Sequence, residues 1–265
     1  MTGPADPVQA ARAVDLDRAD AYGLAFADVY DRWYDGVTDA TATAAFVAER
    51  AVTGPVLELG VGSGRLARPL AARGLAVIGL DGSGQMLARC RTSVADDRDD
   101  RDDRGSISLV RSDMRALPFR GPFGAILIAF NTLFNLGDAT EQGRLLIDLA
   151  AVLAPAAPLV IEAMDVSTLA DAPNRSIGLS EVTDDGVVVS ATRLDHDRQT
   201  VTGRHLEVTD RGVTARPWRL RWLTPPQLDD LAGHAGLTLI ERHGSWTGHP
   251  FTASSDAHIS VYHRR

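Results

Sequence analysis

The sequence of 265 residues contains no lysine and a single cysteine. All 27 basic residues are therefore arginine, and 35 acidic residues outnumber them, which gives a formal net charge of −8. Because a nucleic-acid substrate needs a basic surface to meet its phosphates, this balance argues against one. A lone cysteine, Cys90, cannot form a disulfide within the chain, and we expect it to be a buried structural thiol.

Long apolar runs are also lacking, and so is an N-terminal charged segment followed by an apolar one. We therefore expect a soluble cytoplasmic protein with no membrane partner. No group of histidine, cysteine and acidic residues has the spacing of a metal site, so we expect no metal. With 45% apolar residues the chain can bury one good core, and we expect one domain over residues 1–265.

What the sequence does contain is an apolar strand that runs into three alternating glycines, Gly60, Gly62 and Gly64. Glycines let the backbone turn sharply and approach a ligand closely, and the helix that follows presents unpaired N–H groups. Asp81 ends the next apolar strand, residues 75–80. A carboxylate at that place can accept hydrogen bonds from both hydroxyls of a ribose. The pattern indicates a nucleoside-binding site.

A dinucleotide is one candidate ligand for such a site. Its G-x-G-x-x-G pattern, counted from Gly60, requires a glycine where Arg65 stands. Counted from Gly62, the relaxed form is satisfied by Gly64 and Ala67, so a nicotinamide oxidoreductase remains an alternative. The absence of lysine counts against it, because the chain has no Tyr-x-x-x-Lys pair.

The register that fits without relaxation is E-x-G-x-G-x-G, from Glu58 to Gly64. Three later segments accompany it: DGSGQML at 81–87, RSDM at 111–114, and an apolar strand at 123–130 that ends in NTLFNL. Together they resemble class I S-adenosylmethionine-dependent methyltransferases. Among these, the sequence looks most like the small-molecule enzymes of bacterial secondary metabolism, including the aminosugar N-methyltransferases.

This resemblance implies S-adenosylmethionine as the cofactor and assigns roles to residues. Glu58 would face the cofactor ammonium, Asp81 the ribose, and Asp113 with the Met114 N–H the adenine. Arg65 would either face the cofactor carboxylate or be solvated. The remaining cofactor contacts are expected from the glycine turn, the neighbouring loops and the N-terminal segment: Gly60, Gly62, Gly64, Gly82, Met86, Phe130, Asn131, Tyr30 and Tyr34.

The fold that the resemblance implies is α/β: a Rossmann-like, seven-stranded, mostly parallel sheet with an antiparallel last strand. We expect a helical lid over residues 1–52, a cofactor-binding core over 53–165, and a helix with two final strands over 224–265. Residues 166–223 alternate polar and apolar side chains over three stretches, which predicts an antiparallel β insertion after strand five. The insertion would either cap the acceptor site or join two copies in a homodimer.

Aromatic residues in the N-terminal segment recur at spacings of three and four: Tyr22, Phe26, Tyr30 and Trp33. That spacing predicts one aromatic face on a helix. The face either packs on the core or covers the cofactor. The second possibility is supported by residues 29–34, which resemble the Y-D-x-x-Y element of the aminosugar-type enzymes. In those enzymes a tyrosine of this region touches the cofactor.

We expect transfer of a methyl group to nitrogen or oxygen of a small-molecule acceptor by in-line displacement, in which the enzyme mainly positions the acceptor and excludes water. An amine needs no strong base, whereas an alcohol or phenol does. By chain position, His249 and His258 are the predicted bases, with Glu162 third. Asn131 is not followed by the Pro-Pro-aromatic motif of the adenine and cytosine methyltransferases. A scaffold that binds the cofactor without methylating remains a further alternative.

Overall fold

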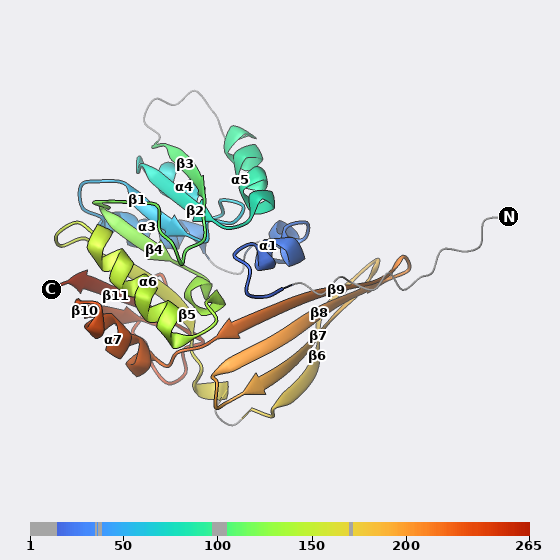
Figure 1. Cartoon of the computed structure of the whole chain (residues 1–265). Helices are drawn as coiled ribbons and strands as arrows, with labels where there is room; N and C mark the ends of the chain where they lie inside the picture. The colour runs from blue at the N-terminus through green and yellow to red at the C-terminus, as the bar shows by residue number, and fades with distance from the viewer. Residues whose placement is uncertain (1–14, 35, 37–38, 97–104, 170–171) are drawn as a thin grey trace.

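Seven strands form a central sheet in the order β10-β11-β5-β4-β1-β2-β3 in a computed structural model of the chain (Figure 1). The structure describes residues 15–34, 36, 39–96, 105–169 and 172–265, so residues 1–14 of the predicted lid lie outside it. The strands are β1 (Val56–Leu59), β2 (Val77–Asp81), β3 (Ile107–Arg111), β4 (Ala125–Ile128), β5 (Leu159–Met164), β10 (Leu237–His243) and β11 (Ala257–Arg264).

Strand directions confirm the predicted sheet. Strands β1 to β5 pair in parallel, whereas β11 pairs antiparallel with both β5 and β10. Parallel strands need both faces covered, and the buried strands are accordingly continuous apolar runs. All four residues of β4 are buried. The carboxyl ends of β1 to β4 therefore meet at one edge, where a parallel α/β sheet binds its ligands.

Helices cover both faces of this sheet. They are α1 (Ala21–Phe26), α2 (Tyr30–Tyr34), α3 (Ala40–Arg50), α4 (Ala67–Ala71), α5 (Gly84–Asp96), α6 (Ala139–Val152) and α7 (Pro225–His234), with short 3-10 turns η1 (Thr132–Asn135) and η2 (Ser167–Leu169). Alternate residues of β1 point to opposite layers. Leu57 and Leu59 join the core with α6 and α7, and Val56 joins the core with α3 and α4. Glu58 consequently points to the layer of Val56.

Side chains at the helix starts fix where α6 and α7 begin. Asp138 accepts a hydrogen bond from the Glu141 N–H at the start of α6. Thr224 and Gln227 form a reciprocal capping box, and Pro225 opens the first turn of α7. Such caps satisfy N–H groups that have no partner inside the helix. The start of α7 at Pro225 lies within a residue of the predicted C-terminal segment, which begins at residue 224.

The insertion is a four-stranded antiparallel sheet rather than three strands: β6 (Arg175–Thr183), β7 (Gly186–Asp195), β8 (Thr200–Thr209) and β9 (Gly212–Arg221). It extends away from the central sheet as an arm (Figure 1). The additional strand, β6, is an exposed edge strand with a register shift between Leu179 and Glu181. That irregularity breaks the period-two pattern and explains why the sequence did not reveal it.

The N-terminal helices α1 and α2 lie between the core and the insertion. Helix α1 contacts both α5 of the core and β9 of the insertion. Rings of Tyr22 and Phe26 stack at 4.6 Å between centroids, and Phe26 meets Trp33 edge-on at 6.2 Å. The predicted aromatic face therefore exists, although it is carried by two short helices instead of one. Within the described part of the chain, no helix has the length and apolar character to cross a membrane.

Candidate functional site

A cavity of about 300 Å³ lies at the carboxyl ends of β1 to β4. Its floor comes from the loops that follow these strands, and its other walls come from the N-terminal segment and from β8 and β9. Every predicted cofactor residue lines it except Gly64: Tyr30, Tyr34, Glu58, Gly60, Gly62, Arg65, Asp81, Gly82, Met86, Asp113, Met114, Phe130 and Asn131.

The glycine turn after β1 is shaped by backbone that only glycine adopts easily. Gly60 has a φ of 70°, and a Cβ built there would lie 2.7 Å from Thr132 Cγ2. At Gly64 an added Cβ would lie 2.6 Å from Cys90 Sγ, so this glycine lets α5 pack under the turn. Burial raises the pKa of the Cys90 thiol to about 11, consistent with a structural role.

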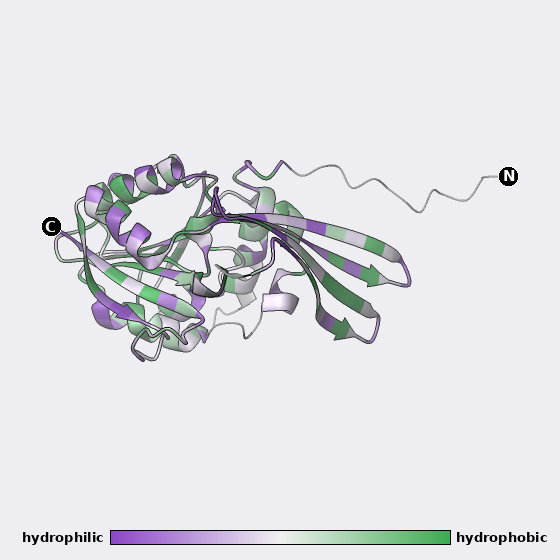
Figure 2. Ribbon diagram, turned by 90° about the horizontal axis from the view of Figure 1, so that it is seen from below, coloured by the Kyte–Doolittle hydropathy of each residue, from purple (hydrophilic) through white to green (hydrophobic). Residues whose placement is uncertain are grey.

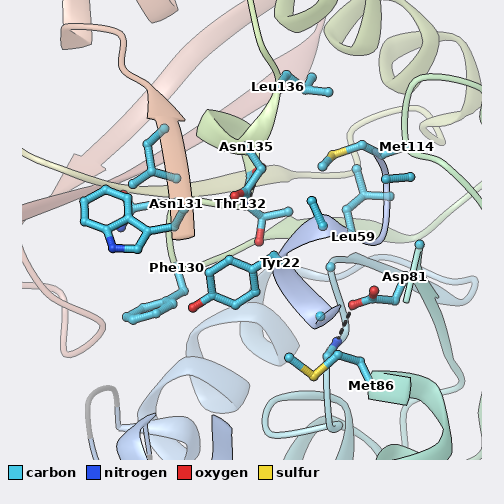
Figure 3. A pocket seen from close by; sticks show the side chains of 18 of the residues that line it. Tyr22, Leu59, Asp81, Met86, Met114, Phe130, Asn131, Thr132, Asn135 and Leu136 are labelled. Carbon is cyan, nitrogen blue, oxygen red and sulfur yellow. Dashed lines mark hydrogen bonds between the residues drawn. The ribbon is translucent and has the colours of Figure 1, made fainter. Parts of the chain in front are cut away.

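Asp81 at the end of β2 braces the same turn. Its Oδ2 accepts the Gly62 N–H at 2.9 Å (Figure 3), and its Oδ1 accepts the Ser83 N–H at 2.8 Å. Burial raises the pKa of this carboxyl, and the two N–H donors oppose the rise. Since a carboxylate oxygen has more than one lone pair, both oxygens can accept a further hydrogen bond from a ligand.

Glu58 and Arg65 form a second polar group in the cavity wall. Glu58 is 3% exposed, and its Oε2 has no hydrogen-bond partner among the described residues. Burial raises its pKa to about 8, although the Arg65 guanidinium opposes that rise. Nε and Nη1 of Arg65 are likewise buried without a partner in the described part of the chain. An acid and a base with unsatisfied atoms thus share one wall, which is the arrangement expected for a zwitterionic ligand.

Asp113, after β3, is held by a neighbour. Arg115 donates to Asp113 Oδ2 from Nε at 2.9 Å and from Nη2 at 2.6 Å, and it also reaches Glu141 at 3.3 Å. Burial of Asp113 opposes ionisation, but the bonds from Arg115 outweigh it and lower the pKa of the carboxyl. Asp113 is therefore an ionised group with little free hydrogen-bonding capacity.

Aromatic rings form a wall that adjoins these polar groups, since the Arg65 guanidinium lies 5.6 Å from the centroid of the Phe130 ring. Tyr34 lies 5.0 Å from Tyr30 and 5.4 Å from Phe130, measured between ring centroids. Tyr22 and Phe130 are turned into the cavity beside Thr132 (Figure 3). Burial raises the pKa of Tyr22, Tyr30 and Tyr34, so all three phenols are neutral at physiological pH. They can donate or accept hydrogen bonds but are not bases there.

The insertion closes the cavity with two rings from adjacent strands. His205 of β8 and Trp218 of β9 stack with their planes 27° apart and their centroids 5.9 Å apart. Both line the cavity, together with neighbouring residues of β9. The insertion is consequently part of the site and not only an appendage of the fold.

Comparisons with known proteins identify the family. Residues 56–156 match the family model described as a methyltransferase domain. The CcbJ methyltransferase from Streptomyces caelestis is 34% identical, with a TM-score of 0.86 over 92% of this chain and 98% of that one. The chain belongs to the class I S-adenosylmethionine-dependent methyltransferases. The nicotinamide oxidoreductase alternative is thereby set aside.

Two further relatives have more specific names. Cypemycin N-terminal methyltransferase of Streptomyces sp is 28% identical over 215 residues, which are 79% of this chain and 83% of that protein. CalS10, an amino pentose methyltransferase from Micromonospora echinaspora solved with S-adenosylmethionine bound, is 22% identical. Its TM-score is 0.67 over 89% of this chain and 96% of that one. At this identity the likeness of CalS10 concerns the fold.

The cofactor of this methyltransferase is S-adenosylmethionine, and the residues present fit it. The unsatisfied Glu58 Oε2 matches its ammonium, and the unsatisfied nitrogens of Arg65 match its carboxylate. The remaining lone pairs of Asp81 match ribose hydroxyls. Within the described residues, no group of three or more potential metal ligands occurs.

The three predicted catalytic residues are not among the residues that line the cavity. His258 is fully buried in β11, its Nδ1 lies 2.9 Å from Ser260 Oγ, and burial lowers its pKa to about 4. His249 is exposed on the loop after β10. Glu162 accepts the Phe130 N–H at 2.8 Å and the Trp246 Nε1–H at 2.9 Å. It therefore lies behind Phe130, which lines the cavity, and does not line the cavity itself. Their positions in the chain place these residues near the edge of the sheet that carries the cavity. Their side chains do not line the cavity.

Other residues of the methyltransferase site were missed from the sequence. Tyr22, Thr132 and Asn135 line the cavity from segments that had been recognised, whereas His205 and Trp218 come from the insertion. Alternation in β8 and β9 shows that successive residues face opposite sides, but not which side faces the core. Which face of β8 and β9 is turned to the core is decided only by the packing of the insertion against α1 and α2.

Proposed function

We propose that this methyltransferase transfers a methyl group to the nitrogen of a small amine. The observation that carries the proposal is the aromatic wall of the cavity, to which Tyr22, Tyr34, Phe130 and Trp218 contribute rings. Faces of aromatic rings attract ammonium and sulfonium cations, so such a wall favours an amine over a neutral alcohol.

The names of two relatives support the same acceptor atom. Cypemycin N-terminal methyltransferase acts on a peptide amino terminus by its name, and CalS10 is named for an amino pentose. Both names describe amines on otherwise different molecules. We extend to this chain only what they share, the amine.

The residues divide the work in this proposal. Asp81 and the glycine turn hold the ribose, and Glu58 and Arg65 hold the amino-acid end, which orients the cofactor. When bound, the cofactor supplies an electrophilic methyl group on a sulfonium. The rings of Tyr22, Tyr34 and Phe130 position the amine and exclude water, and such positioning accounts for much of the rate of a displacement reaction.

A matched acceptor panel tests the proposal. The enzyme is incubated with S-adenosylmethionine and either glucosamine, alanyl-alanine or prolinamide, and in parallel with glucose, N-acetyl-alanyl-alanine or tetrahydrofuran-2-carboxamide. We expect S-adenosylhomocysteine and the mass gain of a methyl group only with amines. Methylation confined to hydroxyl groups would overturn the nitrogen assignment, and turnover without S-adenosylhomocysteine would favour the non-methylating scaffold.

We also propose that the outer face of the insertion joins two copies of the chain. Two cross-strand rows on that face contain only apolar residues: Leu179, Val189, Leu206 and Ala215 in one, and Val182, Val187, Val208 and Val213 in the other. Leu179, Val182 and Val213 are each more than 60% exposed. Figure 2 shows these hydrophobic bands along the arm. Together the two rows form an apolar patch without charges, which can be complementary to itself, as a two-fold interface requires.

Sedimentation measures this assembly directly. We expect a dimer for the native chain and a monomer for Leu179→Asp, with Ser180→Asp as the matched control on the same strand. A native chain that sediments as a monomer over the whole concentration range would contradict the homodimer.

A further inference from the structure

His205 differs from every other titratable side chain in the described cavity wall, because it is a neutral base without a hydrogen-bond partner. The arginines are cationic, and Glu58, with its pKa of about 8, is largely protonated at neutral pH. The remaining groups are neutral phenols or carboxylates already bonded to N–H donors or arginines: Tyr22, Tyr30, Tyr34, Asp17, Asp81, Asp113 and Glu141.

Aromatic packing holds the His205 ring in one place. Trp218 stacks on it, and Phe26 and Trp33 each meet it edge-on with centroids 5.8 Å away. Its Nδ1 is buried without a partner, and no hydrogen bond is made by Nε2 to any described residue. Since the residue lines the cavity and Nδ1 is enclosed, Nε2 is the nitrogen available to a ligand.

The charged groups around this ring neutralise one another. On β8, Glu207 binds Arg216 at 2.9 Å and Arg32 at 2.6 Å. Across the interface with α1 and α2, Asp28 binds Arg216 at 2.6 Å. No carboxylate is therefore left over to stabilise a protonated imidazole, and burial lowers the pKa of His205 below its ordinary value.

We propose that His205 receives the proton of the acceptor amine through Nε2. An amine that enters as an ammonium has no lone pair until one N–H proton has left. In this step the N–H bond breaks, its electron pair stays on nitrogen, and the proton bonds to Nε2. The nitrogen then forms its bond to the methyl carbon as the carbon–sulfur bond breaks, with that pair left on sulfur. The imidazolium returns its proton to solvent after product leaves. This inference rests on the proposed amine methylation.

A spectroscopic measurement on the native enzyme tests contact with the acceptor. With S-adenosylhomocysteine present, the imidazole nitrogens of His205 are followed by long-range proton–nitrogen correlation, and they are assigned in the native enzyme by through-space contacts of the ring protons with Phe26, Trp33 and Trp218. We expect the Nε2 resonance to move when an amine that is methylated in the acceptor panel is added, and not with its matched non-amine. An unmoved resonance at saturating amine would overturn the proposal.

Kinetics then separate proton transfer from simple contact. His205→Gln and His205→Phe should lower kcat about 100-fold and abolish the acid limb of the kcat/KM profile, while affinity for S-adenosylhomocysteine stays within about twofold. His196→Gln, an exposed histidine of the same insertion, should match the native enzyme. A raised KM with native kcat would reduce His205 to a binding residue and overturn the proposal.

The outcomes remain distinguishable from those of the proposed function. If no amine is methylated in the panel, amine methylation fails and this inference falls with it. If amines are methylated at the native rate by both variants, only the role of His205 fails. Should both variants fail to fold, the resonance of the native enzyme decides.

Discussion

The two ends of the cavity are built in different ways. At the cofactor end the decisive contacts are local: Asp81 binds N–H groups of Gly62 and Ser83, which are 19 and 2 residues away. At the end where we propose that the acceptor binds, the contacts that hold the insertion in place cross the chain, since Arg216 binds Asp28 across 188 residues and Arg32 binds Glu207 across 175. The first end depends on backbone shape fixed by a short motif. The second depends on side chains that meet only when lid and insertion dock.

Asp81→Ala should have the largest effect, because it removes the group that braces the glycine turn and that we propose accepts hydrogen bonds from the ribose hydroxyls. Hydrogen bonds to a charged group each contribute about 1.5–3 kcal/mol, so affinity for S-adenosylhomocysteine should fall about 100-fold or more. Isothermal titration calorimetry measures the loss.

The matched control is Asp165→Ala. Asp165 directly follows β5, and its side chain accepts the Ser167 N–H at 3.2 Å outside the cavity wall. We expect affinity within about twofold of the native value. An equal loss in both variants would mean that Asp81 acts through general stability, and the contrast between a local motif and a docked surface would lose its main support.

This contrast also explains what could be predicted from the sequence. The seven-stranded sheet with its antiparallel last strand was predicted through the family resemblance, and the glycine spacing that helps to carry this resemblance shapes the cofactor wall through the backbone. Edge strand β6 was missed because its bulge breaks the alternation. His205 and Trp218 were missed because alternation leaves the choice of face open. His249 and His258 were chosen by chain position, which locates a loop or strand but not the direction of its side chains.

Arg216→Met should have the next largest effect, now at the acceptor end. The Arg216 side chain is 7% exposed and binds Asp28, Glu207 and the Ala25 carbonyl. Its removal leaves Glu207, which is 18% exposed, without that partner, so the free energy of unfolding should fall by about 2 kcal/mol. Urea denaturation measures this. Arg211→Met, at an exposed hairpin tip, should change it by less than about 0.5 kcal/mol.

Affinity for S-adenosylhomocysteine in Arg216→Met sharpens the comparison. We expect it to fall less than in Asp81→Ala, because the cofactor wall does not depend on the insertion. Loss of cofactor binding equal to that of Asp81→Ala would show instead that the two ends form one cooperative unit.

Glu58→Gln should have a smaller effect that depends on pH. In the cofactor-free enzyme burial raises the pKa of Glu58 from 4.5 to about 8. The neutral form is therefore favoured by folding, and its contribution to stability is complete below pH 4.5 and is lost as the pH rises through about 8. Thermal unfolding should show this loss in the native enzyme and a flatter profile in Glu58→Gln.

Binding should reverse that preference, because an ammonium beside Glu58 favours the carboxylate. At pH 7 we expect binding of S-adenosylhomocysteine to release close to one proton in the native enzyme and almost none in Glu58→Gln, with affinity about tenfold lower in the variant. Calorimetry in buffers of different ionisation enthalpy counts the protons. Equal release in both proteins would show that Glu58 does not face the ammonium.

Asp31→Asn should have the smallest effect, since it changes a contact between the two ends. Asp31 of α2 accepts a hydrogen bond from Ser63 Oγ at 2.5 Å and pairs with Arg89 at 2.6 Å, and its side chain is 47% exposed. An ion pair at that exposure contributes less than about 1 kcal/mol to stability. Because Ser63 belongs to the glycine turn, we expect S-adenosylhomocysteine to dissociate about threefold faster while the free energy of unfolding barely changes.

Stopped-flow displacement measures the rate of dissociation from Asp31→Asn, and Asp39→Asn, which changes the cap of α3, is the control. An unchanged rate in Asp31→Asn would show that α2 does not hold the cofactor end closed, so the two ends would be coupled only through the acceptor they share.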